Sequence, residues 1–400
     1  MQIPFFDIKR QYAEIAEEVE QKVLAVMQGA QYIEGNPVRE LEERLADYLG
    51  VKYVITCGNG TDALRIALKA CGVVQGDEVI TTAFTFFATA EAIAQIGAVP
   101  VFAEIREDTL NLDPERIEEK ITSRTKAILP VHIFGMPADM DAIHAIAKRH
   151  HLIVIEDACQ AIGAGYKGKK AGTLGAVGCF SFYPTKNLGA FGDGGAMVTN
   201  EAWIAEACRA YKTHGSGKVG SKTYGRIHHL EEKDLLEENA ASQGFYDPYK
   251  YYNYLIGDNS RLDTIQAAVL CAKLDRLEQW NQRRQEIARQ YREHLKELPI
   301  KLVQKEESGY GSCHHQYAVL AEDKKALAEY LQENGIGTGA FYPIPLHLQK
   351  AFAYLNYSEG DLPVTEKVCR QSVCLPVFPE LEDREVAYII EKIINYYAKH

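Results

Sequence analysis

The pattern of apolar and polar positions divides the chain into segments of different periodicity. Residues 8–28 and 37–49 carry apolar side chains at helical spacing among Glu, Lys and Arg, with a break at Gly35-Asn36-Pro37. This pattern predicts amphipathic helices that pack on the body of the protein or on a second subunit. From Lys52 to about residue 200, short apolar runs alternate with helical stretches instead.

These short apolar runs predict the strands of one sheet. Most are rich in Val and Ile and lack polar alternation, as expected of strands that are covered on both faces. Strands that alternate with helices predict an α/β domain with a mainly parallel sheet, whose ligands bind beyond the carboxyl ends of the strands. The seven predicted strands are residues 53–56, 78–82, 99–103, 127–131, 152–155, 177–182 and 196–198.

The second half of the chain predicts a smaller domain. Residues 212–258 break the rhythm with Gly, Lys, His and Glu and predict a surface insertion. Helical periodicity resumes over 264–298, which we interpret as a bridge, so the domains are placed at 1–270 and 271–400. The tyrosines of the insertion favour packing over a binding surface; they are Tyr246, Tyr249, Tyr251, Tyr252 and Tyr254. The small α+β domain has predicted strands at 316–320 and 372–376 and helices at 324–334 and 383–397.

Composition narrows the class of protein. A chain of 400 residues with 46% hydrophobic and 25% charged residues is typical of a globular protein, and a formal net charge of -11 argues against nucleic-acid binding. No apolar run approaches membrane-spanning length, and no secretory pattern opens the chain, so we expect a cytoplasmic location. Nine scattered cysteines indicate small buried side chains, and Cys313-His314-His315 lacks a second ligand group at zinc spacing, so no metal site is expected.

Residues 181–195, Ser-Phe-Tyr-Pro-Thr-Lys-Asn-Leu-Gly-Ala-Phe-Gly-Asp-Gly-Gly, place Lys186 in a turn of small residues after a predicted strand. One interpretation is a solvated lysine on a glycine-rich surface turn. The other is a Schiff-base lysine, because partial desolvation lowers the pKa of an amine and lets it attack an aldehyde.

Polar residues at other predicted strand ends favour the chemical interpretation. Asp157 either caps a helix or pairs with a protonated ring nitrogen, and Gln160 follows at the spacing of one helical turn. Residues 58–63, Gly-Asn-Gly-Thr-Asp-Ala, would bind an anion at a helix N-terminus. They also match a dinucleotide fingerprint, which predicts a nicotinamide oxidoreductase, but the next strand lacks the acid of that fingerprint. With Thr61, Ser181 and the aromatic Phe86, the set describes a site for pyridoxal 5'-phosphate (PLP).

The sequence resembles the DegT/StrS family of fold-type-I, PLP-dependent sugar aminotransferases over nearly its whole length. The resemblance rests on residues 59–64 (Asn-Gly-Thr-Asp-Ala-Leu), 155–160 (Ile-Glu-Asp-Ala-Cys-Gln), 182–189 (Phe-Tyr-Pro-Thr-Lys-Asn-Leu-Gly), 192–195 (Gly-Asp-Gly-Gly), 259–263 (Asn-Ser-Arg-Leu-Asp) and 342–349 (Tyr-Pro-Ile-Pro-Leu-His-Leu-Gln).

This resemblance implies roles for the cofactor residues. Lys186 would carry PLP and move the proton of the reaction, and Asp157 would pair with the pyridinium nitrogen. Gln160 would bind the ring oxygen, and Phe86 would stack on the ring. Asn259 would reach the phosphate from a partner subunit, which implies a homodimer with shared active sites. The phosphate of PLP would otherwise be held by Gly60, Thr61 and Ser181.

The resemblance also implies a reaction. The amino group of L-glutamate would pass to a keto group of a dTDP- or UDP-linked hexose, for surface-glycan, O-antigen or natural-product synthesis. Lys186 argues against the relatives that carry histidine there and dehydrate their substrate, and Tyr183 favours reaction at C3 over C4. The residues near the sugar nucleotide would be Tyr183, Arg261, Tyr342 and His347.

Two departures from the family pattern concern the substrate. The insertion within 212–258 is longer than in most relatives, and Phe341 stands where several relatives have His or Asn. Besides a C4 enzyme and a nicotinamide oxidoreductase, a PLP-binding regulatory protein without turnover is a further alternative.

Overall fold

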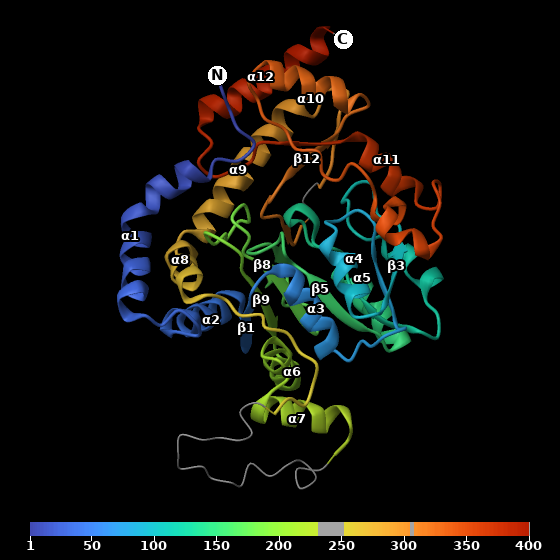
Figure 1. Cartoon of the computed structure of the whole chain (residues 1–400). Helices are drawn as coiled ribbons and strands as arrows, with labels where there is room; N and C mark the ends of the chain where they lie inside the picture. Colours follow the sequence, from blue (N-terminus) through green and yellow to red (C-terminus); the bar gives the residue numbers. More distant parts are fainter. Residues whose placement is uncertain (231–251, 305–307, 400) are drawn as a thin grey trace.

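A seven-stranded sheet forms the centre of the protein (Figure 1). The computed structural model describes residues 1–230, 252–304 and 308–399. The strands are β1 (Tyr53–Cys57), β2 (Glu78–Thr82), β3 (Val99–Ala103), β4 (Thr125–Ile128), β5 (Ile153–Asp157), β8 (Val177–Ser181) and β9 (Gly195–Thr199). Their order is β1-β9-β8-β5-β4-β2-β3, with β9 antiparallel to both neighbours and the other pairs parallel. The predicted mainly parallel sheet is confirmed.

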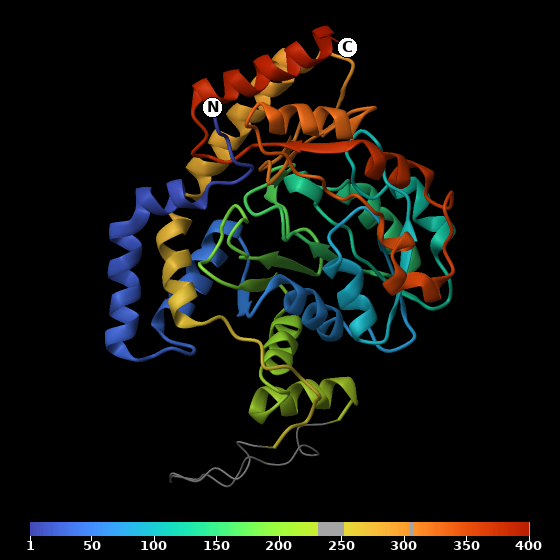
Figure 2. The same cartoon turned by 45° about the horizontal axis from the view of Figure 1, so that its top comes forward.

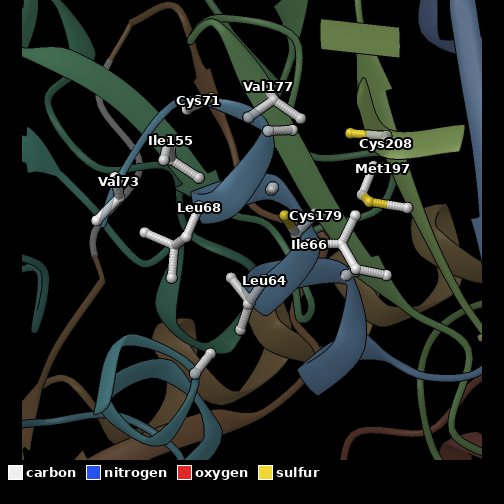
Figure 3. Packing of buried hydrophobic residues seen from close by; sticks show 14 of the residues in the cluster. Leu64, Ile66, Leu68, Cys71, Val73, Ile155, Val177, Cys179, Met197 and Cys208 are labelled. Atoms are coloured by element: carbon white, nitrogen blue, oxygen red, sulfur yellow. The ribbon is translucent and has the colours of Figure 1, made fainter. Parts of the chain in front are cut away.

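Successive residues of these strands point into cores on opposite faces of the sheet. Ile55 belongs to the core drawn in Figure 3, whereas Val54 belongs to a core on the other face. Burial on both faces explains why the strands lack polar alternation. The first face is covered by α3 (Gly60–Ala70), α4 (Ala88–Gln95) and α6 (Ala202–Lys212), and the second by α2 (Asn36–Leu49), α5 (Met140–His150) and α8 (Thr264–Leu274).

The segment 264–298, predicted as one helical bridge, forms two helices. α8 ends at Leu274 and α9 (Leu277–Leu295) begins after a short turn. Helix α8 is buried along most of its length, because α1 (Ile8–Gly29) and α2 both pack against it (Figure 2). Helix α9 is amphipathic and leads into the smaller part of the protein.

The smaller part is built around a three-stranded antiparallel sheet in the order β10-β12-β13. Ile3 pairs with Ile336 and lies in the core of this part, although the sequence placed residues 1–270 together. The domain boundary at 270/271 stays a prediction. The strands are β10 (Lys301–Leu302), β12 (Tyr317–Leu320) and β13 (Ser372–Leu375), and the helices are α9, α10 (Lys324–Glu333), α11 (Pro363–Gln371) and α12 (Asp383–Lys399). A further small sheet joins β6 (Gly165–Tyr166), β7 (Lys169–Lys170) and β11 (Tyr310–Gly311).

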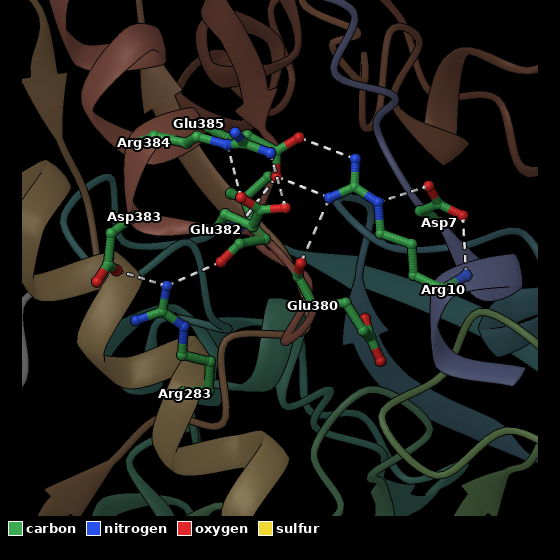
Figure 4. A network of polar contacts seen from close by, with 9 residues as sticks. Asp7, Arg10, Arg283, Glu380, Glu382, Asp383, Arg384 and Glu385 are labelled. Atoms are coloured by element: carbon green, nitrogen blue, oxygen red, sulfur yellow. Dashed lines mark hydrogen bonds and ion pairs between the residues drawn. The ribbon is translucent and has the colours of Figure 1, made fainter. Parts of the chain in front are cut away.

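Ion pairs join the start of α12 to α1 and α9 (Figure 4). The guanidinium of Arg10 binds both carboxylate oxygens of Glu385, at 2.7 and 2.8 Å. Arg283 on α9 binds Asp383 at 2.7 Å. The Arg10–Glu385 pair is the stronger of the two ion pairs, because the guanidinium binds both carboxylate oxygens. It connects the N-terminal helix to the C-terminal part.

The insertion begins with α7 (Gly217–Ile227), which lies below α6 in Figure 1. Beyond it, Tyr246, Tyr249 and Tyr251 lie outside the described residues. The rings of Tyr252 and Tyr254 pack against each other, with centroids 4.8 Å apart, and Tyr254 also contacts Tyr224. These contacts lie within the insertion, and packing of its tyrosines onto the body of the protein stays a prediction.

Three observations concern membrane-spanning helices, metal sites and cysteines, which the composition also addressed. Within the described ranges, no helix has both the length and the apolar character needed to cross a membrane. The same residues contain no group of three or more His, Cys, Asp or Glu side chains placed to hold a metal ion. All nine cysteines are free, and eight are buried, as small apolar side chains usually are.

Candidate active site

A cavity of about 530 Å³ lies at the carboxyl ends of β1, β2, β5 and β8. Its position is the one expected of a ligand site in a parallel α/β sheet. The structure brings most of the predicted site residues to this cavity, from segments far apart in the sequence. Those that line it are Gly60, Thr61, Phe86, Asp157, Gln160, Ser181, Tyr183, Lys186 and Tyr342.

One end of the cavity is the N-terminus of α3. Asn59 caps this helix by accepting a hydrogen bond from the backbone N–H of Asp62. A Cβ atom on Gly60 would lie 2.7 Å from the Cβ of Ser181, so only glycine lets the helix come this close to the end of β8. The amides of the first turn and the Ser181 hydroxyl therefore form a compact cradle for an anion.

Asp157 ends β5 as a buried carboxylate, 5% exposed. Its Oδ2 accepts a hydrogen bond from Thr89 Oγ1 at 2.7 Å, and Thr89 lies 2.9 Å from Thr85 Oγ1. Because the single hydroxyl proton of Thr89 goes to the carboxylate, Thr85 is the donor to Thr89. The only signal of this threonine pair in the sequence is two hydroxyl side chains four residues apart after β2, which did not mark it as part of the site.

Removal of the Thr89 hydroxyl should weaken the cofactor site without unfolding the protein. Thr89→Val keeps the side-chain shape but leaves one oxygen of Asp157 without its donor, and we expect kcat to fall about tenfold. Thr85→Val removes the donor to Thr89 and leaves the Thr89 contact with Asp157 in place, so it should have a smaller effect. Steady-state kinetics, with thermal unfolding as a check on folding, measures both. Equal activity of Thr89→Val and the wild type would contradict a role for this hydroxyl.

Glu156 points away from the cavity and is fully buried. It accepts hydrogen bonds from the backbone N–H groups of Gly172, Leu174 and Gly175. His132 Nε2 lies 2.7 Å from Glu156 Oε2, and His132 Nδ1 accepts from the N–H of Ala138. His132 is therefore the neutral tautomer with its proton on Nε2, and it donates to Glu156. This set of contacts fixes the strand end that carries Asp157.

Lys186 extends from the turn after β8 into the cavity. Burial lowers the pKa of its amine, while the Cys159 thiol and the Asp157 carboxylate act in the opposite direction. A lowered pKa increases the fraction of free amine, which is the form that attacks an aldehyde. The surroundings thus favour the Schiff-base interpretation over a solvated surface lysine.

His315 lines the cavity beside Lys186 and was missed as a site residue. The amide of Asn187 donates to Asn281 Oδ1 and to the carbonyl of Cys313, so its own oxygen must accept from His315 Nδ1 at 3.1 Å. Burial and the positive charges of Lys186 and Arg284 hold the pKa of His315 well below its usual range. The ring is therefore neutral, with Nε2 free to accept a hydrogen bond.

Gln160 and Tyr342 meet at the wall of the cavity. Gln160 Oε1 accepts from the N–H of Phe134 at 2.8 Å, and Gln160 Nε2 donates to the hydroxyl oxygen of Tyr342 at 2.8 Å. Phe86 and Tyr183 lie at the mouth and are 59% and 53% exposed. The cavity thus has a polar floor and an aromatic entrance.

Comparison with known proteins decides what this cavity belongs to. The model of the DegT/DnrJ/EryC1/StrS aminotransferase family matches residues 13–394. The chain belongs to this family.

Individual relatives match this aminotransferase over almost its whole length. A Geobacillus stearothermophilus protein named pleiotropic regulatory protein is 45% identical, covering 99% of each chain. UDP-2-acetamido-2-deoxy-3-oxo-D-glucuronate aminotransferase of Pseudomonas aeruginosa is 41% identical, over 98% of this chain and 100% of the relative. The crystal structure of S. venezuelae DesV in complex with a ketimine intermediate superposes with a TM-score of 0.89 at 37% identity, covering 99% and 98% of the two chains.

PLP is the cofactor of this aminotransferase. A Bacillus subtilis relative, 31% identical with a TM-score of 0.85 and covering 99% and 85% of the two chains, was solved with the related cofactor PMP bound. The residues present fit the group, because a buried carboxylate, an amine of lowered pKa and an anion cradle meet in one cavity. The dinucleotide interpretation of residues 58–63 is not retained.

Three predicted residues of the aminotransferase lie outside this cavity. Asn259 pairs with Thr213, and Arg261 follows in a segment that packs behind the start of α3, where Ser260 binds Asp62. The role predicted for Asn259 concerns a partner subunit and stays a prediction. His347 is buried and lies 3.2 Å from a carboxylate oxygen of Glu366, so the structure does not bring it to the cavity. His347 lies on a short 3₁₀ turn after Pro345, where it and Leu346 are buried.

Proposed function

We propose that this aminotransferase moves an amino group from L-glutamate to the C3 keto group of a dTDP- or UDP-linked hexose. The product would be an amino sugar for surface glycans, O-antigen or a natural product. Relatives named for UDP-linked and dTDP-linked 3-amino or 3-oxo sugars support this substrate class. The observation that carries the proposal is the meeting of Lys186 and Asp157 in one cavity of suitable size.

Each part of the cavity has a task in this reaction. PLP, when bound, supplies an electron sink for the carbon that exchanges its amino group. Asp157 would hold the positive charge of a ring nitrogen, and the cradle at Gly60 would bind the phosphate. Lys186 Nζ would move the proton, since a lowered pKa increases the fraction of the amine that is unprotonated and can act as a base. Tyr183 at the mouth would orient the sugar.

The charge of the cavity supports a homodimer with shared sites. Among the described lining residues, Lys186 is the one lysine or arginine, whereas Asp157 and Asp193 are acidic. A cofactor phosphate and a nucleotide diphosphate together bring several negative charges, which need cationic or amide donors. Asn259 and Arg261 lie outside the cavity of their own chain, and we infer that a second subunit contributes these side chains.

The test is amino transfer by the PLP-loaded enzyme against dTDP- and UDP-linked 3-keto and 4-keto sugars, with glutamate as donor. We expect kcat/KM for a 3-keto sugar to exceed that for its 4-keto isomer by at least about tenfold. The reverse preference would favour the C4 alternative. Bound PLP without turnover on any of the sugars would favour a regulatory protein, a possibility raised by the name of the Geobacillus relative.

A further inference from the structure

The hydrogen bonds of Gln160 leave the hydroxyl proton of Tyr342 available. An amide NH₂ group cannot accept a hydrogen bond, so the contact from the N–H of Phe134 identifies the oxygen of Gln160. The other end, Nε2, then donates to the Tyr342 oxygen. Because the oxygen of Tyr342 is the acceptor there, its own proton must go elsewhere. No hydrogen bond within the described ranges takes that proton.

Aromatic rings fix the position of this hydroxyl. The ring of Tyr342 contacts Phe84 and Phe341 edge to face, with centroids 5.7 Å apart in each case, and stacks on Phe134 at 6.1 Å. Burial raises the pKa of Tyr342, with the Gln160 contact opposing this rise and the Asp157 charge adding to it. Tyr342 is therefore a neutral, preorganised donor at the wall of the cavity.

We propose that Tyr342 contacts the cofactor rather than the sugar nucleotide, by donating its hydroxyl proton to the ring oxygen of PLP beside Gln160. This inference rests on the proposed function, because it requires PLP on Lys186. Gln160 follows β5, whereas Tyr342 belongs to the segment between α10 and α11. The pair thus gives the smaller part of the protein a direct contact with the cofactor.

Two donors at the ring oxygen have an electrostatic consequence. In the Lys186–PLP linkage, a proton on the nitrogen is stabilised by the negative charge of the ring oxygen. Donors from Gln160 and Tyr342 stabilise that charge when the nitrogen is unprotonated, so they lower the pKa of the linkage. The Tyr342 hydroxyl therefore shifts the resting enzyme toward the unprotonated form.

The experiment is a pH titration of the visible absorption of the holoenzyme. Tyr342→Phe removes the hydroxyl and keeps the ring, so we expect the midpoint to rise by about one pH unit or more. Tyr357→Phe is the matched control. Tyr357 is a half-buried tyrosine that accepts from the N–H of Phe102 away from the cavity, and its variant should titrate like the wild type. Thermal unfolding and PLP affinity, measured on all three proteins, show whether each variant is folded and loaded.

The titration midpoint of Tyr342→Phe shows whether Tyr342 contacts the cofactor. A raised midpoint in Tyr342→Phe alone supports the inference. An unchanged midpoint overturns it, and if the KM for the keto sugar rises instead, Tyr342 is a substrate contact. A folded Tyr342→Phe protein that binds PLP as tightly as the wild type and titrates identically leaves the proposed function standing. If wild-type protein incubated with PLP shows no visible absorption, the proposed function fails, and the inference fails with it.

Discussion

Replacement of Lys186 by alanine is expected to abolish amino transfer and the visible absorption of PLP bound through this residue. In the proposed reaction, the Lys186 amine both attaches the cofactor and acts as the base. General acid–base catalysis alone contributes about 10²–10⁴-fold, so loss of both tasks should lower kcat by about 10⁴-fold or more. The measurement is single-turnover amino transfer, together with an absorption spectrum of protein dialysed with PLP.

The matched control for this variant is Lys169→Ala. Lys169 is an exposed lysine on β7 and does not line the cavity, so its removal should change neither the spectrum nor the rate. Lys186→Arg separates charge from chemistry, because an arginine keeps a cation but cannot supply a free amine at neutral pH. If Lys186→Ala kept the same spectrum and rate as the wild type, the assignment of Lys186 would be wrong.

The sheet and the cofactor residues could be predicted because their signals are local. Seven apolar runs without alternation predict buried strands. The motif residues follow the ends of those strands, and a parallel topology brings these strand ends to one edge of the sheet. Lys186, Asp157 and Gly60 are therefore found together. The end of a helix is harder to predict: the apolar pattern continues across the turn between α8 and α9, although the two helices pack against different parts of the protein.

The residues that the sequence did not reveal come together only through the tertiary fold. Asn187 lies in the 182–189 motif, but nothing local indicates its role, which depends on Asn281 on α9 and on His315 before β12. The resemblance also placed His347 near the substrate, whereas the fold buries it against Glu366. Side-chain direction in an irregular segment depends on the packing around it, and no periodicity predicts that direction.

Glu156→Ala is expected to cause the largest loss of stability among the variants considered. The change removes the acceptor of the ring N–H of His132 and of the N–H groups of Gly172, Leu174 and Gly175. His132 and Gly172 are buried, and Leu174 and Gly175 are half-buried. A buried donor left without a partner costs about 1–3 kcal/mol, and four donors are affected, so the thermal midpoint should fall by about 5 °C or more. The measurement is thermal unfolding of the protein without PLP, which separates this effect from cofactor binding.

Glu156→Gln should recover part of this loss, for a geometric reason. Its carbonyl oxygen can accept from Leu174 and Gly175, which both bind Oε1, whereas its NH₂ group would face the N–H groups of Gly172 and His132, which bind Oε2. His132 cannot relieve the clash by moving its proton to Nδ1, because that atom accepts from Ala138. Glu115→Ala, on an exposed 3₁₀ turn, should change stability by no more than about 0.5 kcal/mol. The expected order of midpoints is wild type and Glu115→Ala, then Glu156→Gln, then Glu156→Ala. If Glu156→Ala unfolded with the wild-type midpoint, the buried carboxylate would not be what fixes the strand end beside Asp157.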